Sequence, residues 1–259
     1  MDRQATLEAF DDQLRRNPQP VPGTQVERTD RIVRIVAADG GWSGVVWSDL
    51  GIDADAVIAA EAVRFEQTGG PWEWKHYSYD QPVDLPARLV AAGLAPDQPE
   101  TVLVAEIADL ALEEPPPVGV RLVPVVDAAG VEALVGVHDE VFGGDHAAVG
   151  RAVLSGLARR PSLIAAVLAE ADGRTISSGR LEFHPGTDFA SLWGGGTVAA
   201  WRGRGVFRSL VAYRAALARE RGFRYLQVDA TPDSRPILQR LGFVEIATTT
   251  AYQIPGAPE

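Results

Sequence analysis

The pattern of hydrophobic and polar residues in the C-terminal half of the chain predicts alternating strands and helices. Apolar residues recur at helical spacing in AAGVEALVGVHDEVF and AAVGRAVLSGLARR, whereas β-branched and aromatic runs between glycine-containing turns are typical of strands. The resulting order is β-α-α-β-β-β-α-β-α-β. The predicted strands cover residues 120–125, 162–169, 175–184, 189–198, 224–230 and 244–254, and the predicted helices cover 128–142, 147–160, 206–221 and 233–243.

The N-terminal half repeats the last part of this order. Strand-like runs at 43–50, 72–80 and 100–107 alternate with a helix-like run at 53–70 and with the segment 79–94. At a constant offset this segment aligns with residues near the C-terminus, and the shared order of elements favours a degenerate duplication over chance. The matching pairs are Asp80 with Asp229, Asp84 with Asp233, Leu89 with Leu238, and Gly93 with Gly242.

A run of three prolines marks the clearest boundary in the chain. Pro115, Pro116 and Pro117 cannot continue a helix or a central strand, and such a run favours an extended spacer. We therefore expect two domains, residues 1–117 and 118–259. The first carries 21 acidic and 9 basic residues, a charge of −12, and the second carries 14 and 15, a charge of +1.

Composition narrows the classes of function. The net charge of −11 argues against nonspecific nucleic-acid binding; it mildly favours cationic small partners, although solubility alone explains it. The chain has no cysteine, which excludes disulfides and thiolate zinc sites, and its basic residues are 23 arginines and one lysine, which we attribute to codon bias. The acidic, amphipathic start is unlike a signal peptide, and apolar runs are shorter than the roughly 18 residues of a membrane span. We expect a cytoplasmic protein without membrane contact.

The stretch Arg202-Gly203-Arg204-Gly205 carries the clearest chemical signal. It follows a predicted strand and precedes the predicted helix 206–221. Glycine permits a tight turn with close approach of the backbone to a ligand, and the first N–H groups of a helix lack internal partners at the positive end of its dipole. The combination predicts a receptor for a phosphate group. The corresponding segment of the first half, GIDADAV, carries Asp53 and Asp55, which repel a phosphate.

These residues resemble the signature of the GNAT superfamily of N-acetyltransferases. The family places Arg or Gln, two residues, Gly, one residue and a small residue between its central strand and the following helix, and Arg202, Gly205 and Phe207 occupy that frame. The ending Leu241-Gly242-Phe243 and the element order from 120 to 254 also match the family. The resemblance covers about the C-terminal 140 residues well. The first half resembles a degenerate second copy of the family's fold that lacks the glycine loop.

The resemblance implies an α/β (α+β) fold of two GNAT-like units, each a mixed, mostly antiparallel twisted sheet flanked by helices. It also implies acetyl-CoA between two diverging strands, 190–198 and 224–230, with the diphosphate on backbone N–H groups of the loop and the pantetheine paired like an added strand. Arg235 is a further candidate for the phosphate charge. The residues expected at the cofactor are Gly196, Thr197, Val198, Arg202, Gly203, Arg204, Gly205, Val206, Phe207, Arg208 and Ser234.

Two departures from the family pattern affect the expected chemistry. Phe207 stands where the signature has a small residue, which narrows the approach to the start of the helix. Leu238 stands where the family often has a tyrosine that reprotonates the departing thiolate. The motif therefore supplies no acid. Ser234 has a second interpretation, since its position also suits a helix N-cap.

Acetyl transfer to an amine needs a base, an oxyanion site and an acid. Glu182 is our candidate base, with His184 on the same strand face as the other option; solvent-facing polar groups are the plainer interpretation. Residues 194–196, three glycines, fit a strand bulge that holds an oxyanion, or a purely structural bulge. Tyr252 is either the acid or a buried tyrosine of the last strand. Trp193 either lines the acceptor pocket or only packs in the protein interior. Asp229 either binds a cationic amine or caps structure, as Asp80 suggests.

The sequence thus predicts an acetyl-CoA-dependent N-acetyltransferase acting directly on a primary amine of a small, cationic acceptor. The alternative is a catalytically silent module that binds CoA as a sensor or scaffold. His76, His138 and His146 lack metal-ligand spacing, so we expect no metal. The glycine loop lacks the third glycine and the ribose-binding acid of a dinucleotide site. We expect a monomer or homodimer without nucleic-acid partners.

Overall fold

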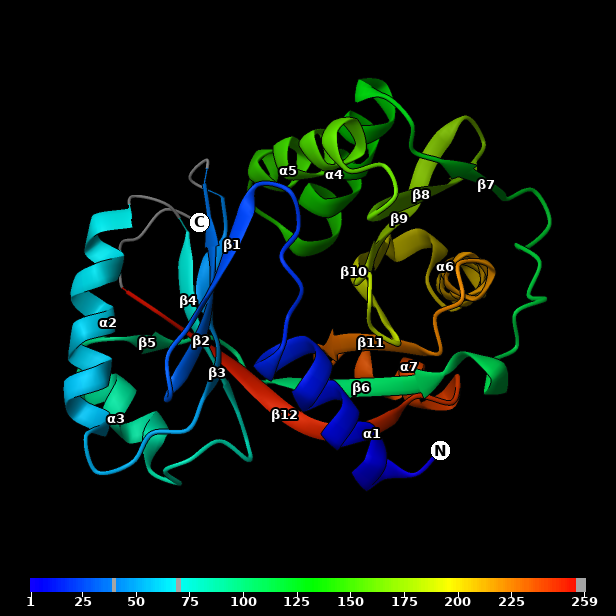
Figure 1. The fold of residues 1–259 in the computed structure, drawn as a ribbon. Coiled ribbons are helices and arrows are strands. Elements are labelled where there is room, and N and C mark those ends of the chain that lie inside the picture. Colours follow the sequence, from blue (N-terminus) through cyan, green and yellow to red (C-terminus); the bar gives the residue numbers. More distant parts are fainter. Residues whose placement is uncertain (39–40, 69–70, 255–259) are drawn as a thin grey trace. The chain divides into compact units, whose positions relative to one another are not determined.

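The computed structural model describes residues 1–38, 41–68 and 71–254, which pack as two compact units (Figure 1). The C-terminal unit contains residues 104–228 and 237–244, and the N-terminal unit contains residues 2–103, 229–236 and the chain from 245 onward. This division differs from the predicted cut near residue 117. Its cause is the last strand, because residues 249–252 pair with strand residues 74–77 of the N-terminal unit.

The C-terminal unit is built on a twisted, mostly antiparallel sheet in the order β11-β10-β9-β8-β7, of which only the pair β10–β11 is parallel. Helices α4 and α5 lie against one face and α6 against the other (Figure 1). Its elements are η2 Ile107–Asp109, β7 Arg121–Pro124, α4 Ala128–Phe142, α5 Ala147–Arg159, β8 Ile164–Ala171, β9 Arg174–Phe183, β10 Phe189–Thr197, η3 Ala199–Trp201, α6 Val206–Glu220, β11 Tyr225–Ala230 and α7 Arg235–Arg240, the last two extending across the division.

Helix α6 packs through residues spaced by about one turn. Val206 and Leu210 are buried in a cluster with the sheet, and Arg214 follows one turn later. The guanidinium of Arg214 is buried; it donates to the carbonyl oxygens of Leu210 (3.0 Å) and Arg180 (3.1 Å). Burial lowers its pKa to about 10. Among the residues described, no carboxylate lies within ion-pair distance of it, so hydrogen bonds to carbonyl oxygens stabilise the charge.

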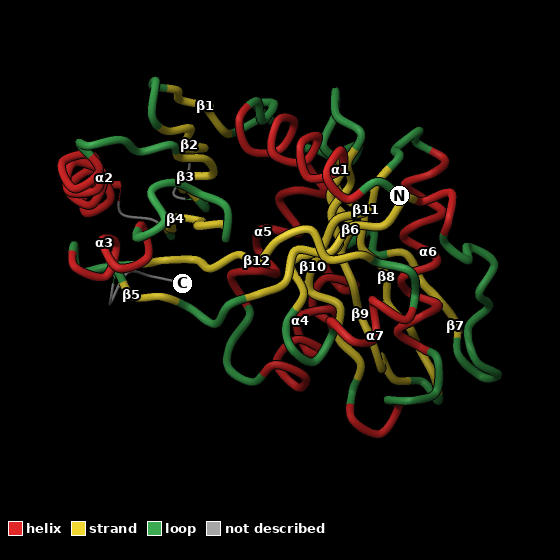
Figure 2. The backbone as a smooth tube through the Cα atoms, turned by 90° about the horizontal axis from the view of Figure 1, so that it is seen from below, coloured by secondary structure: helices red, strands yellow, loops and turns green. Residues whose placement is uncertain are grey.

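The N-terminal unit has the sheet order β1-β2-β3-β4-β12, with β5 paired to β12 and only β3–β4 parallel. Helices α2 and α3 cover the same face of the sheet (Figure 2), over a core that includes Ile58, Trp74 and Leu89. The elements are α1 Arg3–Phe10, η1 Asp11–Arg16, β1 Thr24–Arg28, β2 Ile32–Ala37, β3 Ser43–Ser48, α2 Ala54–Thr68, β4 Trp72–Tyr77, α3 Leu85–Ala91, β5 Ala95–Pro96, β6 Glu100–Glu106 and β12 Val244–Gln253, where β6 and β12 extend across the division.

The two units share a topology that the sequence predicted. In each, a parallel strand pair is joined by a helix, β10-α6-β11 in one and β3-α2-β4 in the other. The predicted fold class is thereby confirmed, and the predicted strands and helices of the C-terminal half lie within a few residues of the observed ones. Sequence analysis missed α1, η1, β1 and β2, because their short apolar runs lack a clear period.

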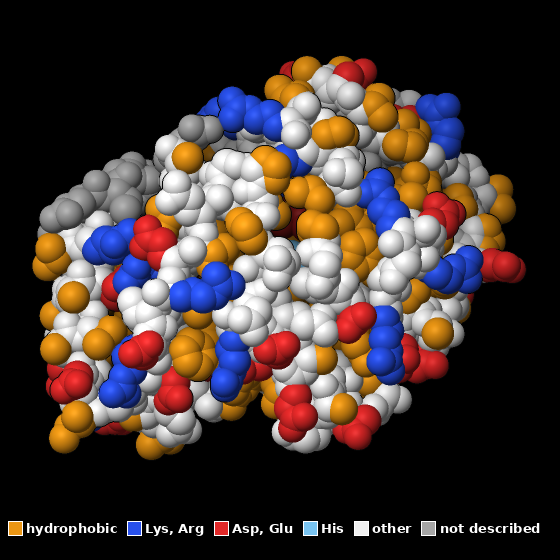
Figure 3. Space-filling view, viewed as in Figure 1, with side chains coloured by type: hydrophobic (Ala, Val, Ile, Leu, Met, Phe, Trp, Pro, Cys, Tyr) orange, Lys and Arg blue, Asp and Glu red, His pale blue; other side chains and the backbone are white. Residues whose placement is uncertain are grey.

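The surface carries charges of both signs. Acidic and basic side chains of the described residues are interspersed on the face drawn in Figure 3. Within the described part of the chain, no helix combines the length and the apolar character needed to cross a bilayer. On the face drawn in Figure 3 the acidic side chains are not gathered in one patch.

Candidate functional site

The central strands of the C-terminal unit part after a short paired stretch. Residues 189–191 of β10 pair with residues 225–227 of β11, whereas β10 continues to Thr197 without a further described partner on that side. Ser191 and Gln227 are the last pair before the strands separate, and the Ser191 hydroxyl donates to Gln227 Oε1 at 2.7 Å. The predicted divergence of these two strands is present.

A bulge follows in β10 at the three glycines. The register against β9 shifts between Trp193 and Gly196, and Gly194 has a φ of +56°, a conformation that glycine adopts without strain. Each glycine makes room for a side chain of this chain. A Cβ at Gly194 would lie 2.6 Å from His138, one at Gly195 2.9 Å from Phe207, and one at Gly196 2.9 Å from Val141.

The contact between Phe207 and Gly195 explains how a large residue fits where the signature has a small one. The ring of Phe207 lies against Gly195, so the strand glycine accommodates the large residue at the start of α6. Phe207 and Gly195 form a matched pair across the contact between helix and strand.

This pairing predicts a specific second-site effect. We expect Gly195→Ala to lower the free energy of unfolding by about 1–3 kcal/mol, because the added methyl overpacks the ring of Phe207. Phe207→Leu in the same chain should recover part of that loss, which urea unfolding of the two single variants and the double variant measures. Additive losses would show that the two residues are not coupled.

The loop after β10 is the place where the sequence predicts an anion receptor. Gly203 (φ +74°) and Gly205 (φ +89°) adopt left-handed backbone conformations, and α6 begins at Val206. Gly205 accepts the first helical hydrogen bond, from Ser209 N at 3.1 Å. Within the described ranges no acceptor is bonded to the backbone N–H groups of residues 203–208. These groups are available at the positive end of a 15-residue helix.

The arginines around this loop have partners of their own. Arg202 Nε donates to the Thr197 carbonyl at 2.9 Å, so it fixes the loop to the end of β10. Arg204 lies over the Trp201 ring at 4.9 Å, and Arg208 Nε lies 3.0 Å from a carboxylate oxygen of Glu114. The Arg208 side chain is 54% exposed, so this ion pair is weak and can exchange for an anion.

Polar groups at the predicted pantetheine position already carry hydrogen bonds. The Gly196 carbonyl accepts from the Ser177 hydroxyl at 2.5 Å, and the Thr197 carbonyl accepts from Arg202. Val198 N donates to the Ile176 carbonyl at 2.9 Å. A carbonyl oxygen has two lone pairs, so the first two groups can still accept a second hydrogen bond. The role of Gly196–Val198 stays a prediction.

The two candidate bases differ in their surroundings. Glu182 Oε1 lies 3.0 Å from Arg180 Nε, and the Glu182 side chain is 37% exposed. His184 Nε2 lies 2.7 Å from the Ser191 hydroxyl, which extends the Ser191–Gln227 contact into a chain of three polar side chains at the point of strand separation. Burial lowers the pKa of His184, so its ring is neutral near pH 7.

Trp193 shares a strand face with Ser191. Its ring lies 5.8 Å from the Arg180 guanidinium, and the indole is partly buried. The structure thus gives Trp193 a packing partner next to Glu182 and leaves its role toward an acceptor a prediction.

Three predicted site residues belong to the N-terminal unit. Asp229 Oδ2 lies 2.6 Å from Nζ of Lys75, and both side chains are largely buried. Burial alone would lower the pKa of Lys75, but the charges of Asp229, Tyr77 and Glu73 and the hydrogen bond to Asp229 together outweigh it, and the pKa is raised. Since Lys75 neutralises Asp229, the structural interpretation of this aspartate is favoured.

The other two residues are Tyr252 and Ser234. Tyr252 lies on β12 opposite Trp74, with its ring edge-on to His76 at 6.2 Å, and burial raises its pKa. Ser234 precedes α7, and its hydroxyl lies 3.1 Å from Thr231 Oγ1. Their catalytic and cofactor roles stay predictions.

Sequence analysis missed a histidine cluster beside the bulge. His138 Nε2 lies 3.0 Å from the Gly194 carbonyl oxygen. The His146 ring lies 5.6 Å from that of His138, and its Nδ1 lies 3.0 Å from Asp139. These residues were considered only as metal ligands, and the contact with Gly194 arises from packing that no local pattern reveals. In the described part of the chain no His, Asp and Glu side chains form a group of three that could hold a metal.

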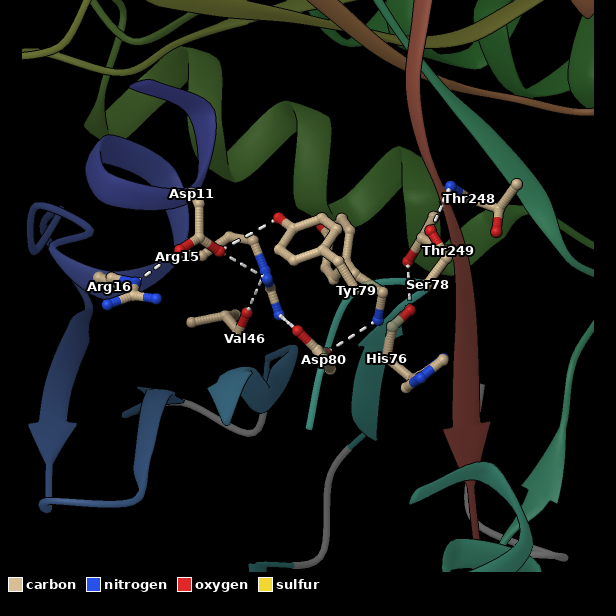
Figure 4. Close-up of polar contacts among 11 residues, drawn as sticks. Asp11, Arg15, Arg16, Val46, His76, Ser78, Tyr79, Asp80, Thr248 and Thr249 are labelled. Atoms are coloured by element: carbon tan, nitrogen blue, oxygen red, sulfur yellow. Dashed lines mark hydrogen bonds and ion pairs between the residues drawn. The ribbon is translucent and has the colours of Figure 1, made fainter. Parts of the chain in front are cut away.

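The equivalent place in the N-terminal unit is filled by the chain itself. Strands β3 and β4 pair over residues 43–45 and 72–74 and then separate, and the chain segments that follow them meet again at a parallel bridge between Asp49 and Gln81. The buried side chain of Arg15 lies beyond the paired residues; its Nε donates to the Val46 carbonyl at 3.0 Å and its Nη2 to Asp80 at 2.8 Å (Figure 4). Asp11 accepts from Nη1 at 2.7 Å, and the Tyr77 ring lies 3.9 Å from the guanidinium.

Comparisons with known proteins bear on the fold. No family model matches the chain, and no curated protein matches it by sequence. Among solved structures, a GCN5-related N-acetyltransferase from Kribbella flavida is similar, with 20% identity, a TM-score of 0.67, and coverage of 98% of this chain and 94% of the other. A GCN5-related N-acetyltransferase-like protein from Streptococcus suis 89/1591 is also similar. Its sequence identity is 12% and its TM-score 0.61, with 97% of this chain and 97% of that chain covered.

A tandem GNAT protein from the clavulanic acid biosynthesis pathway is also similar. Its identity is 13% and its TM-score 0.58, with 96% of this chain and 93% of that chain covered. The likeness spans both units rather than the C-terminal one alone. Over nearly its whole length the chain therefore has the fold of these GCN5-related N-acetyltransferase structures.

Proposed function

We propose that the chain is an acetyl-CoA-dependent N-acetyltransferase that acts directly on a primary amine of a small, cationic acceptor. The observation that carries the proposal is the set of unpartnered N–H groups at residues 203–208, placed where β10 has parted from β11. This combination suits a diphosphate carried on an extended acyl carrier. The negative net charge supports a cationic acceptor.

In this proposal the chemistry needs no covalent enzyme intermediate. The amine nitrogen forms a bond to the thioester carbon, the carbon–sulfur bond breaks, and the sulfur leaves as a thiolate that takes a proton. Glu182 receives the ammonium proton through water before attack, and its exposure allows water to reach it. The bulge at residues 194–196 holds the developing oxyanion. The thiolate takes its proton from solvent water.

Only the C-terminal unit is proposed to bind the cosubstrate. In the N-terminal unit, Arg15 bonds to the Val46 carbonyl of β3 and to Asp80, which follows the end of β4, so its side chain lies beside the place where these strands separate. The segment that follows β3 carries Asp53 and Asp55 instead of a glycine loop. We therefore expect one CoA per chain.

The test combines binding with turnover. Isothermal titration with CoA should give one site per chain, and thiol release from acetyl-CoA should follow on adding kanamycin, spermidine or putrescine. Absence of CoA binding would contradict the proposal.

The second candidate is a CoA-binding sensor or scaffold. It is favoured by one observation, the buried Leu238 at the position where the resembling family often has its acid. Tight CoA binding without thiol release on any amine of the panel would select this alternative.

A further inference from the structure

His138 of α4 is joined to the bulge of β10 by a hydrogen bond of fixed direction. Its Nε2 lies 3.0 Å from the Gly194 carbonyl oxygen, which can only accept. The proton is therefore on Nε2, and the ring is the donor. His138 is buried, with 4% of its surface exposed.

The surroundings of His138 keep this bond in place. The ring packs edge-on against Phe142 (5.3 Å) and His146 (5.6 Å). Burial lowers the pKa of His138 to about 4, although the bond to Gly194 opposes that shift. The neighbouring charges are those of Asp139, His146 and Arg180. The ring is accordingly neutral, with a single donor, near pH 7.

The bond also determines the direction of the next peptide N–H. A trans peptide is planar, with its C=O and N–H pointing in opposite directions. Because His138 holds the carbonyl of Gly194, the N–H of Gly195 points away from the ring. Gly194 has a φ of +56°, and a Cβ there would lie 2.6 Å from the His138 ring, so the glycine permits this arrangement.

We propose that His138 is a positioning residue that orients the Gly194–Gly195 peptide, so that the Gly195 N–H donates to the acyl oxygen of acetyl-CoA. The inference rests on the proposed function, since it names the group that prepares the oxyanion site of the same reaction. The hydrogen bond from the Gly195 N–H becomes stronger as negative charge develops on that oxygen. His138 does not touch the acyl group itself.

The test compares His138→Leu, which removes the donor, with His138→Gln, which keeps an N–H donor near the position of Nε2. We expect His138→Leu to lower kcat about 100-fold with the fastest amine of the panel above, because one oxyanion donor is misplaced. The KM for acetyl-CoA should rise no further than the lost preference for acetyl-CoA over CoA, since the loop at residues 203–208 is untouched. His138→Gln should recover most of the loss in kcat.

A binding measurement makes the test independent of turnover. Titrations with acetyl-CoA and with CoA should show that the parent chain prefers acetyl-CoA, and that His138→Leu loses this preference while it keeps its affinity for CoA. His146→Leu is the matched control, since His146 contacts the His138 ring but not Gly194, and it should keep the preference. Thermal unfolding shows that each variant is folded.

The outcomes separate this inference from the proposed function. If His138→Leu loses affinity for acetyl-CoA and CoA equally, or keeps the preference of the parent, His138 only fills the core and the inference is overturned. If the parent chain binds neither compound, the proposed function fails and the inference fails with it.

Discussion

Gly205→Asp is expected to weaken CoA binding by at least 100-fold. Gly205 is the residue before α6, and the N–H groups that follow it are the proposed diphosphate site. An aspartate there places a carboxylate beside a ligand of the same sign and competes for the same donors. One pair of unit charges at about 4 Å costs on the order of 4 kcal/mol near a protein surface, and about 1.4 kcal/mol is tenfold in affinity.

Gly205→Asn is the matched control for this variant. Asparagine has the same shape and also tolerates a left-handed backbone, which this position requires at a φ of +89°. It lacks the charge, so any loss of affinity from shape alone appears in both variants. Titration calorimetry with CoA measures the difference, which should fall as salt is raised. Equal affinities of the two variants would place the diphosphate elsewhere.

Arg15→Ala is expected to lower the free energy of unfolding of the N-terminal unit by about 3–5 kcal/mol. Arg15 bonds to Asp80 and Asp11, and the side chains of Arg15 and Asp80 are each 2% exposed. Removing one partner leaves a carboxylate buried without its opposite charge, which costs far more than the pair contributes in water. The Val46 carbonyl loses its donor as well.

Arg16 supplies the control for Arg15. It is the next residue, it pairs with the same Asp11, and its side chain is 55% exposed. Arg16→Ala should cost less than about 1 kcal/mol because water screens that pair. Urea unfolding followed by far-UV circular dichroism measures both variants. Similar losses for the two would show that the burial of Arg15 does not determine its contribution.

The parts of the candidate site that the sequence predicted are those set by local chemistry. A glycine-rich turn before an amphipathic helix determines its backbone conformation locally, so the turn at Gly203 and Gly205 and the start of α6 could be predicted, whereas the role of this loop as a phosphate site stays a prediction. The strand and helix order followed from hydrophobic periods, and the likeness to solved structures agrees with the resulting fold class.

The parts that sequence analysis missed depend on contacts between distant residues. His138 and Gly194 are 56 positions apart, and Arg15 and Asp80 are 65 apart. Neither contact produces a hydrophobic period or a motif spacing that sequence analysis can detect. The division into units was missed for the same reason, because the pairing of β12 with β4 joins residues far apart in sequence.

The ion pair between Lys75 and Asp229 has a consequence for the chemistry of the chain itself. Acyl thioesters modify exposed lysine amines without any catalyst, and amine-directed dyes and cross-linkers use the same reaction. Lys75 is the single lysine of the sequence, and its ammonium is held charged and shielded by a carboxylate. If the proposed cosubstrate binds, the chain thus offers it no exposed lysine side chain for self-acylation.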